Sequence, residues 1–186
     1  MVKKVIANPD NQYIFIDTKN CYQVNLKTIA SKELVVKASI EGEYLRDLVV
    51  KVEDNGKDVF VSAGFLPNFI APNDKLSAHK VISISLDINI PQNSNVQLFG
   101  TNSILYAEGN YKLLQVSLAD GDCTLNNIIE KAEVKTQKGN IVVIAKNGTI
   151  EATSTYGEVS EHNIPKGFAS YILKSVEGDI QINKTE

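Results

Sequence analysis

An eight-residue pattern recurs four times in the C-terminal half of this 186-residue chain, and it constrains the fold more than any other feature. Each copy opens with an apolar residue, has glycine at its sixth position and returns to an apolar residue at its eighth. The glycines are Gly121, Gly139, Gly157 and Gly178, separated by 18, 18 and 21 residues. A period of roughly 20 residues is typical of a solenoid, because one unit is too small to bury its own apolar face and stacks on its neighbours instead.

The chemistry of the pattern predicts how the copies stack. We expect each glycine to form a structural turn and to hold a backbone conformation with positive φ at that corner. The residue after each glycine is polar and suits a solvated turn: Asp122, Asn140, Glu158 and Asp179. The chain then re-enters the core with Cys123, Ile141, Val159 and Ile180. Neighbouring strands lie ~4.8 Å apart, so these apolar residues should form one column inside the core.

The rest of the chain also has the period of β-strands. Apolar and polar residues alternate most clearly over residues 82–90, and no stretch of ten or more residues has the apolar spacing of a helix. An imperfect earlier copy of the pattern runs from Val96 to Gly100. The sequence therefore predicts a single all-β domain over residues 1–186. Residues 91–186 form a solenoid with rungs of about 18–21 residues, and residues 1–90 are irregular strands that cap it.

With the repeat established, the chain resembles a known family. The segment from Ile88 to Gln92, followed by Val96 to Leu98, is similar to the family's strand that ends in proline before the coil begins. Gly-Asp or Gly-Asn turns follow at Gly121, Gly139 and Gly178. These motifs resemble the bacterial putative-adhesin family of β-strand repeat proteins of uncharacterised function, also called head GIN domains or auto-transporter adhesins. The resemblance covers nearly the whole chain, since residues 12–90 are similar to the family's irregular N-terminal strands. It implies a right-handed β-helix-like solenoid exported to the cell envelope, with no established catalytic residues.

Charge and hydropathy exclude several classes of protein. The net charge is −3 and Arg46 is the single arginine, so we expect no nucleic-acid partner. No stretch approaches the ~18 apolar residues of a membrane-spanning helix. Only three apolar residues follow Lys4, which is too short for a signal peptide. We therefore expect the cell envelope, either periplasm or outer surface, if a leader has been removed, and otherwise the cytoplasm.

The sequence predicts no catalytic residues and no cofactor. The polar turn residues could offer oxygen ligands to a cation, with Asp122, Glu158 and Asp179 as weak metal candidates, but solvated turns explain them better. Cys21 and Cys123 have no metal-ligand spacing and are expected to be unpaired, buried thiols. The two histidines lack the neighbours of a nucleophilic site, which leaves a β-helix polysaccharide-active enzyme as the least favoured alternative.

The longest segment without a periodic pattern covers residues 65–80, and two interpretations stay open. Its apolar side chains could cap an open end of the coil. Alternatively, it is a binding loop whose candidate contact residues are Asn68, Phe69, Asn73, Asp74 and His79.

The predicted function is a non-enzymatic envelope scaffold or adhesin-like binding protein, with an unknown envelope protein or glycan as partner. A carbohydrate-binding module is the alternative, and aromatic side chains aligned along one outer face would favour it. Its candidate stacking platforms are Tyr106, Tyr111, Tyr156, Tyr171 and Phe168. The strand from Ile180 to Lys184 ends in charges, which suits a protected edge, so we expect a monomer or weak dimer rather than filaments.

Overall fold

The computed structural model describes residues 2–7, 13–41, 48–65 and 83–185. These residues form fifteen β-strands of one mixed sheet, with no helix among them, which confirms the all-β prediction. The strands are β1 (Val2–Ala7), β2 (Tyr13–Asp17), β3 (Gln23–Ile29), β4 (Glu33–Glu41), β5 (Leu48–Asp54), β6 (Asp58–Phe65), β7 (Ser83–Pro91), β8 (Ser94–Gly100), β9 (Ile104–Leu118), β10 (Cys123–Thr136), β11 (Ile141–Ala145), β12 (Thr149–Ser154), β13 (Val159–Glu161), β14 (Ser170–Ser175) and β15 (Ile180–Lys184).

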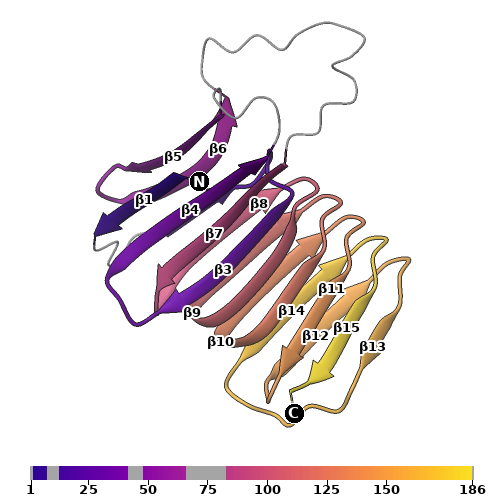
Figure 1. Cartoon of the computed structure of the whole chain (residues 1–186). Helices are drawn as coiled ribbons and strands as arrows, with labels where there is room; N and C mark the ends of the chain where they lie inside the picture. Colours follow the sequence, from indigo (N-terminus) through magenta and orange to yellow (C-terminus); the bar gives the residue numbers. More distant parts are fainter. Residues whose placement is uncertain (1, 8–12, 42–47, 66–82, 186) are drawn as a thin grey trace, which may run out of the picture.

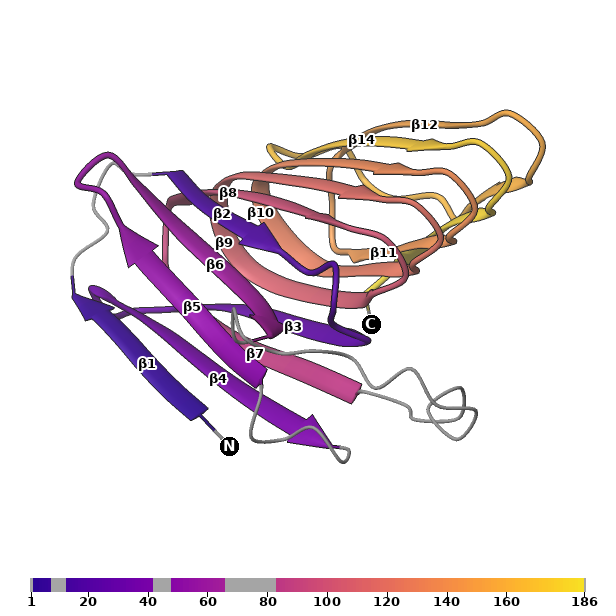
Figure 2. The ribbon, with the colours of Figure 1, turned by 90° about the horizontal axis from the view of Figure 1, so that it is seen from above.

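The sheet folds over into two faces that share a core (Figure 2). The first face has the strand order β1-β4-β7-β3-β9-β10-β11-β15-β13. The second face has the order β5-β6-β2-β8-β9-β10-β14-β12. The long strands β9 and β10 belong to both faces, because each bends near its middle. Antiparallel pairs occur at the N-terminal end, between β1 and β4, β4 and β7, and β5 and β6, while the remaining pairs are parallel.

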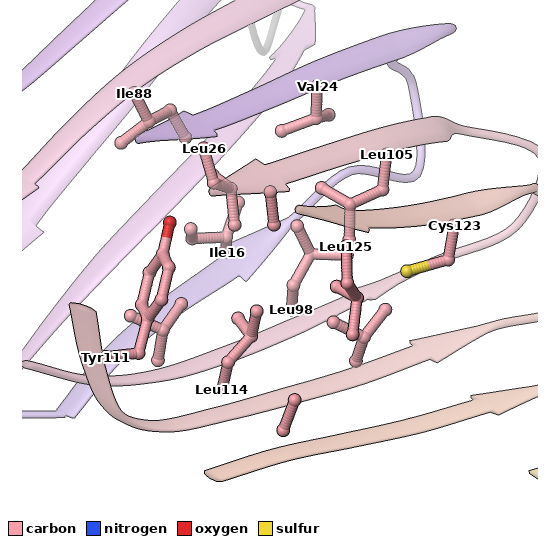
Figure 3. Close-up of a cluster of buried hydrophobic side chains, with 14 of the residues drawn as sticks. Ile16, Val24, Leu26, Ile88, Leu98, Leu105, Tyr111, Leu114, Cys123 and Leu125 are labelled. Carbon is pink, nitrogen blue, oxygen red and sulfur yellow. The ribbon is translucent and has the colours of Figure 1, made fainter. Parts of the chain in front are cut away.

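The predicted core column exists. Cys123 pairs with Ile141, Ile141 with Ile180, and Ile180 with Val159, so all four residues share one register. The column continues through Leu105 toward the N-terminal strands, and Cys123 is fully buried beside it (Figure 3). Val159 is 43% exposed because it lies on β13, the last strand of the first face.

The order of the turns in space differs from their order in the chain. Strand β15 lies between β11 and β13, and β14 lies between β10 and β12 (Figure 1). The turn made by β14 and β15, which comes last in the sequence, therefore lies between the turn of β10 and β11 and the turn of β12 and β13. The N-terminal end behaves in the same way, since β3 lies between β7 and β9. The expectation that the C-terminal strand forms the protected edge is wrong, because among the described strands β12 and β13 each have one hydrogen-bonded neighbour and form that edge.

Crowding, rather than positive φ, explains the repeated glycines. In the described chain only Gly56 and Gly109 have positive φ among the glycines, so the expectation for the four turn glycines is wrong. A Cβ atom on any of them would lie 2.5–2.9 Å from a backbone carbonyl carbon of the neighbouring turn. Each turn is packed so closely on the next that only a hydrogen atom fits there.

Side chains connect the turns at this glycine corner. The backbone N–H of Asn140 donates to the Asp122 carboxylate at 2.8 Å, and the N–H of Asp179 donates to the Asn140 side chain at 2.9 Å. On the inner side, the Thr136 hydroxyl lies 3.0 Å from the Ser175 hydroxyl of the next turn. Because the first two bonds satisfy backbone groups that the tight turns leave unpaired, they fix each turn on its neighbour.

The imperfect copy from Val96 to Gly100 does pair with the first octet, but it is displaced by three residues from the alignment that matches the two glycines. Gly100 pairs with Leu118 rather than with Gly121. Ser103 takes the place next to Gly121, and its buried hydroxyl lies 2.7 Å from the carbonyl oxygen of Cys21. The proposed division of the chain after residue 90 stays a prediction, although β2 and β3 lie among the parallel strands of the stack.

Candidate functional site

A groove runs over the outer surface where the first face bends into the second. It consists of three adjoining hollows with volumes of about 320, 320 and 400 Å³. The first two share Lys27, Glu108 and Asn126, and the last two share Asn127 and Ile129. We call this surface the corner groove. Because β9 and β10 bend at matching register positions, the hollows beside the two bends join into one extended depression.

Apolar side chains stand open to solvent along the corner groove. Tyr106 lines the first hollow and is 47% exposed. Ile129 lines the other two and is 54% exposed, and Phe168 in the last is fully exposed. Contact of large apolar side chains with water is unfavourable, so a groove lined by three of them is a surface suited to binding.

Polar side chains lie between the two aromatic rings. Lys27 and Glu108 form an ion pair across β3 and β9. The Asn127 amide donates to the Asn126 side chain at 3.1 Å and accepts a hydrogen bond from the Thr185 hydroxyl at 2.9 Å. These contacts orient the polar groups before any ligand arrives, so little conformational entropy remains to be lost on binding.

Backbone conformation shapes the groove. Gly109 has φ of 114° and Asn127 has φ of 48°, both in the left-handed region, where the strands turn the corner. A Cβ on Gly109 would lie 3.1 Å from Cβ of Thr28, so this position requires glycine for space as well as conformation. The Thr28 hydroxyl accepts a hydrogen bond from the backbone N–H of Asn110 at 2.8 Å. The side-chain oxygen of Asn110, also in the groove wall, is buried without a hydrogen-bond partner among the described residues.

The second face carries a smaller polar hollow of about 300 Å³. The Gln97 amide donates to Gln115 at 2.8 Å, and the Gln115 amide donates to Glu133 at 2.9 Å. Lys131 pairs with Glu133 at 2.6 Å, and these hydrogen bonds from Lys131 and Gln115 lower the pKa of the Glu133 carboxyl. The polar groups mainly bind one another, which leaves fewer of them for a ligand than in the corner groove.

A row of aromatic rings continues this line of side chains on the second face. Phe15 and Phe60 stack with centroids 5.1 Å apart and planes 12° apart, and Tyr13 lies beside Phe15. The stacked faces of Phe15 and Phe60 cover one another and stabilise the parallel pair of β2 and β6, while Phe60 and Tyr13 are still 42% and 41% exposed.

The structure separates the predicted stacking platforms into two groups. Tyr111 and Tyr171 are wrong as platforms, since both are buried in the core; the Tyr171 hydroxyl donates to the carbonyl oxygen of Ile128 at 2.8 Å. Tyr106, Tyr156 and Phe168 are exposed, but Tyr156 lies at the glycine corner, away from the groove.

Among the metal candidates, Asp179 and Glu158 lie on neighbouring turns, whereas the Asn140 turn separates both from Asp122, and part of the hydrogen-bonding capacity of Asp122 and Asp179 is in use. One carboxylate oxygen of Asp122 accepts from the next turn, and one of Asp179 accepts from the N–H of Glu158 at 2.8 Å. No group of three metal-ligating side chains forms in the ranges that the structure describes. The predicted contact residues Asn68, Phe69, Asn73, Asp74 and His79 lie outside those ranges.

Both cysteines lie in the core. Burial and the nearby Asp17 carboxylate raise the pKa of the Cys21 thiol to about 12. Complete burial, with a contribution from Asp122, also raises the pKa of Cys123. Thiols of this kind are poor nucleophiles at neutral pH, since the thiolate is the reactive form. The absence of a disulfide stays a prediction.

Sequence reasoning missed most of the corner groove, although the repeat contained a signal for it. Glu108, Asn126 and Ile144 are spaced by the 18-residue period and occupy one row across β9, β10 and β11. Lys27 joins the same row from β3. Applying the period to outward-facing residues as well as to core residues would have placed three of these four side chains together.

Comparison with known proteins is informative at the level of fold. No family model and no curated protein sequence matches the chain. Among solved structures, a putative cell adhesion protein from Clostridium sporogenes is similar over 99% of both chains, with 16% identity and a TM-score of 0.66. A putative adhesin from Bacteroides fragilis aligns over 99% of this chain and 96% of its own, with 10% identity and a TM-score of 0.38. The chain therefore shares its fold with the Clostridium protein. No helix in the described part of the chain is long and apolar enough to span a membrane.

Proposed function

We propose that this chain is a non-enzymatic, adhesin-like binding protein of the bacterial cell envelope, built on a right-handed β-helix-like solenoid of the head GIN type. The observation that carries the proposal is the corner groove, an open surface whose polar groups are already positioned and whose apolar groups are exposed. The name of the Clostridium structure, a putative cell adhesion protein, supports the same function.

The composition of the groove favours binding over catalysis. Glycoside hydrolysis uses two carboxyl groups facing one scissile bond. Glu108 is the single carboxylate among the residues that line the three hollows, and it pairs with Lys27. A paired lone carboxylate does not provide the separate acid and base that the reaction needs.

Rigidity also suits adhesion. The strands beneath the groove are paired on both sides, with β9 between β3 and β10, and β10 between β9 and β11. A surface held in this way cannot rearrange without breaking several backbone hydrogen bonds. A binding site on this surface therefore keeps its shape when mechanical force acts on the bound partner.

The test is retention of beads that carry the purified chain on surfaces coated with peptidoglycan, chitin or cellulose, and on a collagen-coated surface as protein probe. We expect saturable retention on at least one surface and no release of new reducing ends from the polysaccharides. Absence of retention on all of them would refute adhesion, and steady release of reducing ends would show an enzyme instead. Size-exclusion chromatography with light scattering should give a monomer or weak dimer.

A further inference from the structure

We infer that the corner groove binds an extended, neutral polysaccharide, with Tyr106 and Phe168 as stacking platforms for separate sugar units. This inference rests on the proposed function and names its ligand class. It places the ligand across the strands, along the direction in which the turns stack.

A row of outward-facing side chains, three of them polar, sets this direction. Lys27, Glu108, Asn126 and Ile144 stand side by side on β3, β9, β10 and β11. Neighbouring strands are ~4.8 Å apart, which is close to the length of one sugar unit in an extended chain. Each successive unit of such a chain therefore meets one further strand.

The two ends of the groove share the same chemistry. Tyr106 lies two residues before Glu108 on β9, on the first-face side of this row, with Asn25 and Thr124 as its partners on the neighbouring strands. Phe168 stands at the other end, beside Ile129 and Lys146. Neither ring stacks on another ring in the described structure, in contrast to Phe15 and Phe60. Their faces remain open to the C–H faces of a sugar ring, while the amides between them reach its hydroxyl groups.

The charge of the groove favours a neutral chain. The Lys27 and Glu108 charges compensate each other at its centre. Among the lining residues only Lys146 adds a further charge, and it lies at the Phe168 end. Strong attraction for a polyanion would need a series of unpaired cations along the groove.

A peptide fits this surface less well. An extended peptide that binds as a β-strand gains its affinity from main-chain hydrogen bonds to the free edge of a sheet. The groove crosses strands β3, β9, β10 and β11, whose backbone groups already pair on both sides. The groove therefore offers side chains only, and these suit a ligand rich in hydroxyl groups.

The experiment is isothermal titration calorimetry of the purified chain with cello-, chito-, manno- and xylo-oligosaccharides of one to six units, and with polygalacturonate as an acidic comparison. We expect at least one neutral series to bind with an affinity that rises with chain length. Tyr106→Ala and Phe168→Ala should each weaken that binding about tenfold, the loss expected for one stacking contact.

Two variants serve as matched controls. Tyr22 is 47% exposed, the same as Tyr106, and Tyr156 is 81% exposed, but neither lines the groove. Tyr22→Ala and Tyr156→Ala should leave the affinity within twofold of the parent. All four side chains are exposed, so each variant is expected to fold, and circular dichroism checks this.

The outcomes separate the two proposals. Retention on peptidoglycan or collagen, without binding of any neutral oligosaccharide, would refute the polysaccharide inference and leave the adhesin function standing. Binding that the Tyr22 or Tyr156 control weakens as much as the groove variants would also overturn the inference, as would binding of polygalacturonate alone. No binding in either experiment would refute both.

Discussion

Replacing Gly139 by alanine would place a methyl group where two turns of the chain meet. The new Cβ would lie 2.5 Å from the carbonyl carbon of Gly121 and 3.2 Å from the backbone nitrogen of Asp122. Real Cβ atoms do not approach a carbonyl group so closely, and both groups belong to backbone held by hydrogen bonds. The two turns must therefore move apart at this corner.

The cost follows from the bonds that this movement breaks. The N–H of Lys138 donates to the carbonyl of Ala119 at 2.9 Å, and the N–H of Asn140 donates to Asp122 at 2.8 Å. Losing both costs about 2 kcal/mol. Overpacking of the corner adds about 1–2 kcal/mol. We expect Gly139→Ala to lower the free energy of unfolding by about 3–4 kcal/mol, which corresponds to a fall in Tm of roughly 6–16 °C for a chain of this size.

Urea denaturation followed by far-ultraviolet circular dichroism measures the loss, with two controls. Gly56 has φ of 82°, and a Cβ added there would have no atom within 4 Å, so Gly56→Ala isolates the cost of conformation, about 1 kcal/mol. Lys138 is exposed beside Gly139, and Lys138→Ala should stay within about 0.5 kcal/mol of the parent. If Gly139→Ala costs no more than Gly56→Ala, the crowding argument is wrong.

Three further changes test the core and the order of the turns. Tyr111→Phe should raise the free energy of unfolding by about 1 kcal/mol, because the buried Tyr111 hydroxyl has no partner among the described residues, while Tyr171→Phe should lower it by about 1 kcal/mol; equal midpoints in urea would contradict this. Stability should fall as the pH rises from ~8.5 toward ~10, by up to about 1.4 kcal/mol per pH unit for each thiol, because burial raises the pKa of both cysteines in the folded state and only unfolded thiols ionise; above pH ~10 the buried Tyr111 and Tyr171, whose pKa values are also raised, add to the loss. A variant with Cys21→Ala and Cys123→Val should flatten this slope, and an unchanged slope would exclude the thiols as its cause. Deleting residues 170–186 should expose β12 and β13 to rapid hydrogen exchange, since β14 and β15 are the strands that pair with them; continued protection of β12 and β13 would refute the order of the turns.

The sequence determined those features that depend on local period alone. Alternation with a period of two identifies strands with one buried side, and the recurring octet puts Cys123 and Ile141 in one column. The same 18-residue spacing carries Glu108 and Asn126 to adjacent positions on the outer surface. Such features are readable because neighbouring turns repeat the same backbone path, so equal spacing in sequence becomes adjacency in space.

Only the tertiary structure decided which turns are neighbours. The last three copies of the octet each carry a hydroxyl three residues before the glycine, at Thr136, Ser154 and Ser175, so each suits either neighbour equally well. The structure places Ser175 next to Thr136, with their hydroxyl oxygens 3.0 Å apart, and Ser154 beyond it. Local sequence does not encode the order of these turns, because the order depends on the path of residues 162–169, which connect β13 to β14.

The corner groove depends on tertiary structure for the same reason. Lys27 and Glu108 are 81 residues apart in the chain, and they meet only because β3 inserts between β7 and β9. Phe168 reaches the groove through the return of the chain from β13 to β14. Periodicity predicts which side of a strand faces solvent, whereas the insertion of both terminal turns decides which solvent-facing side chains share a surface.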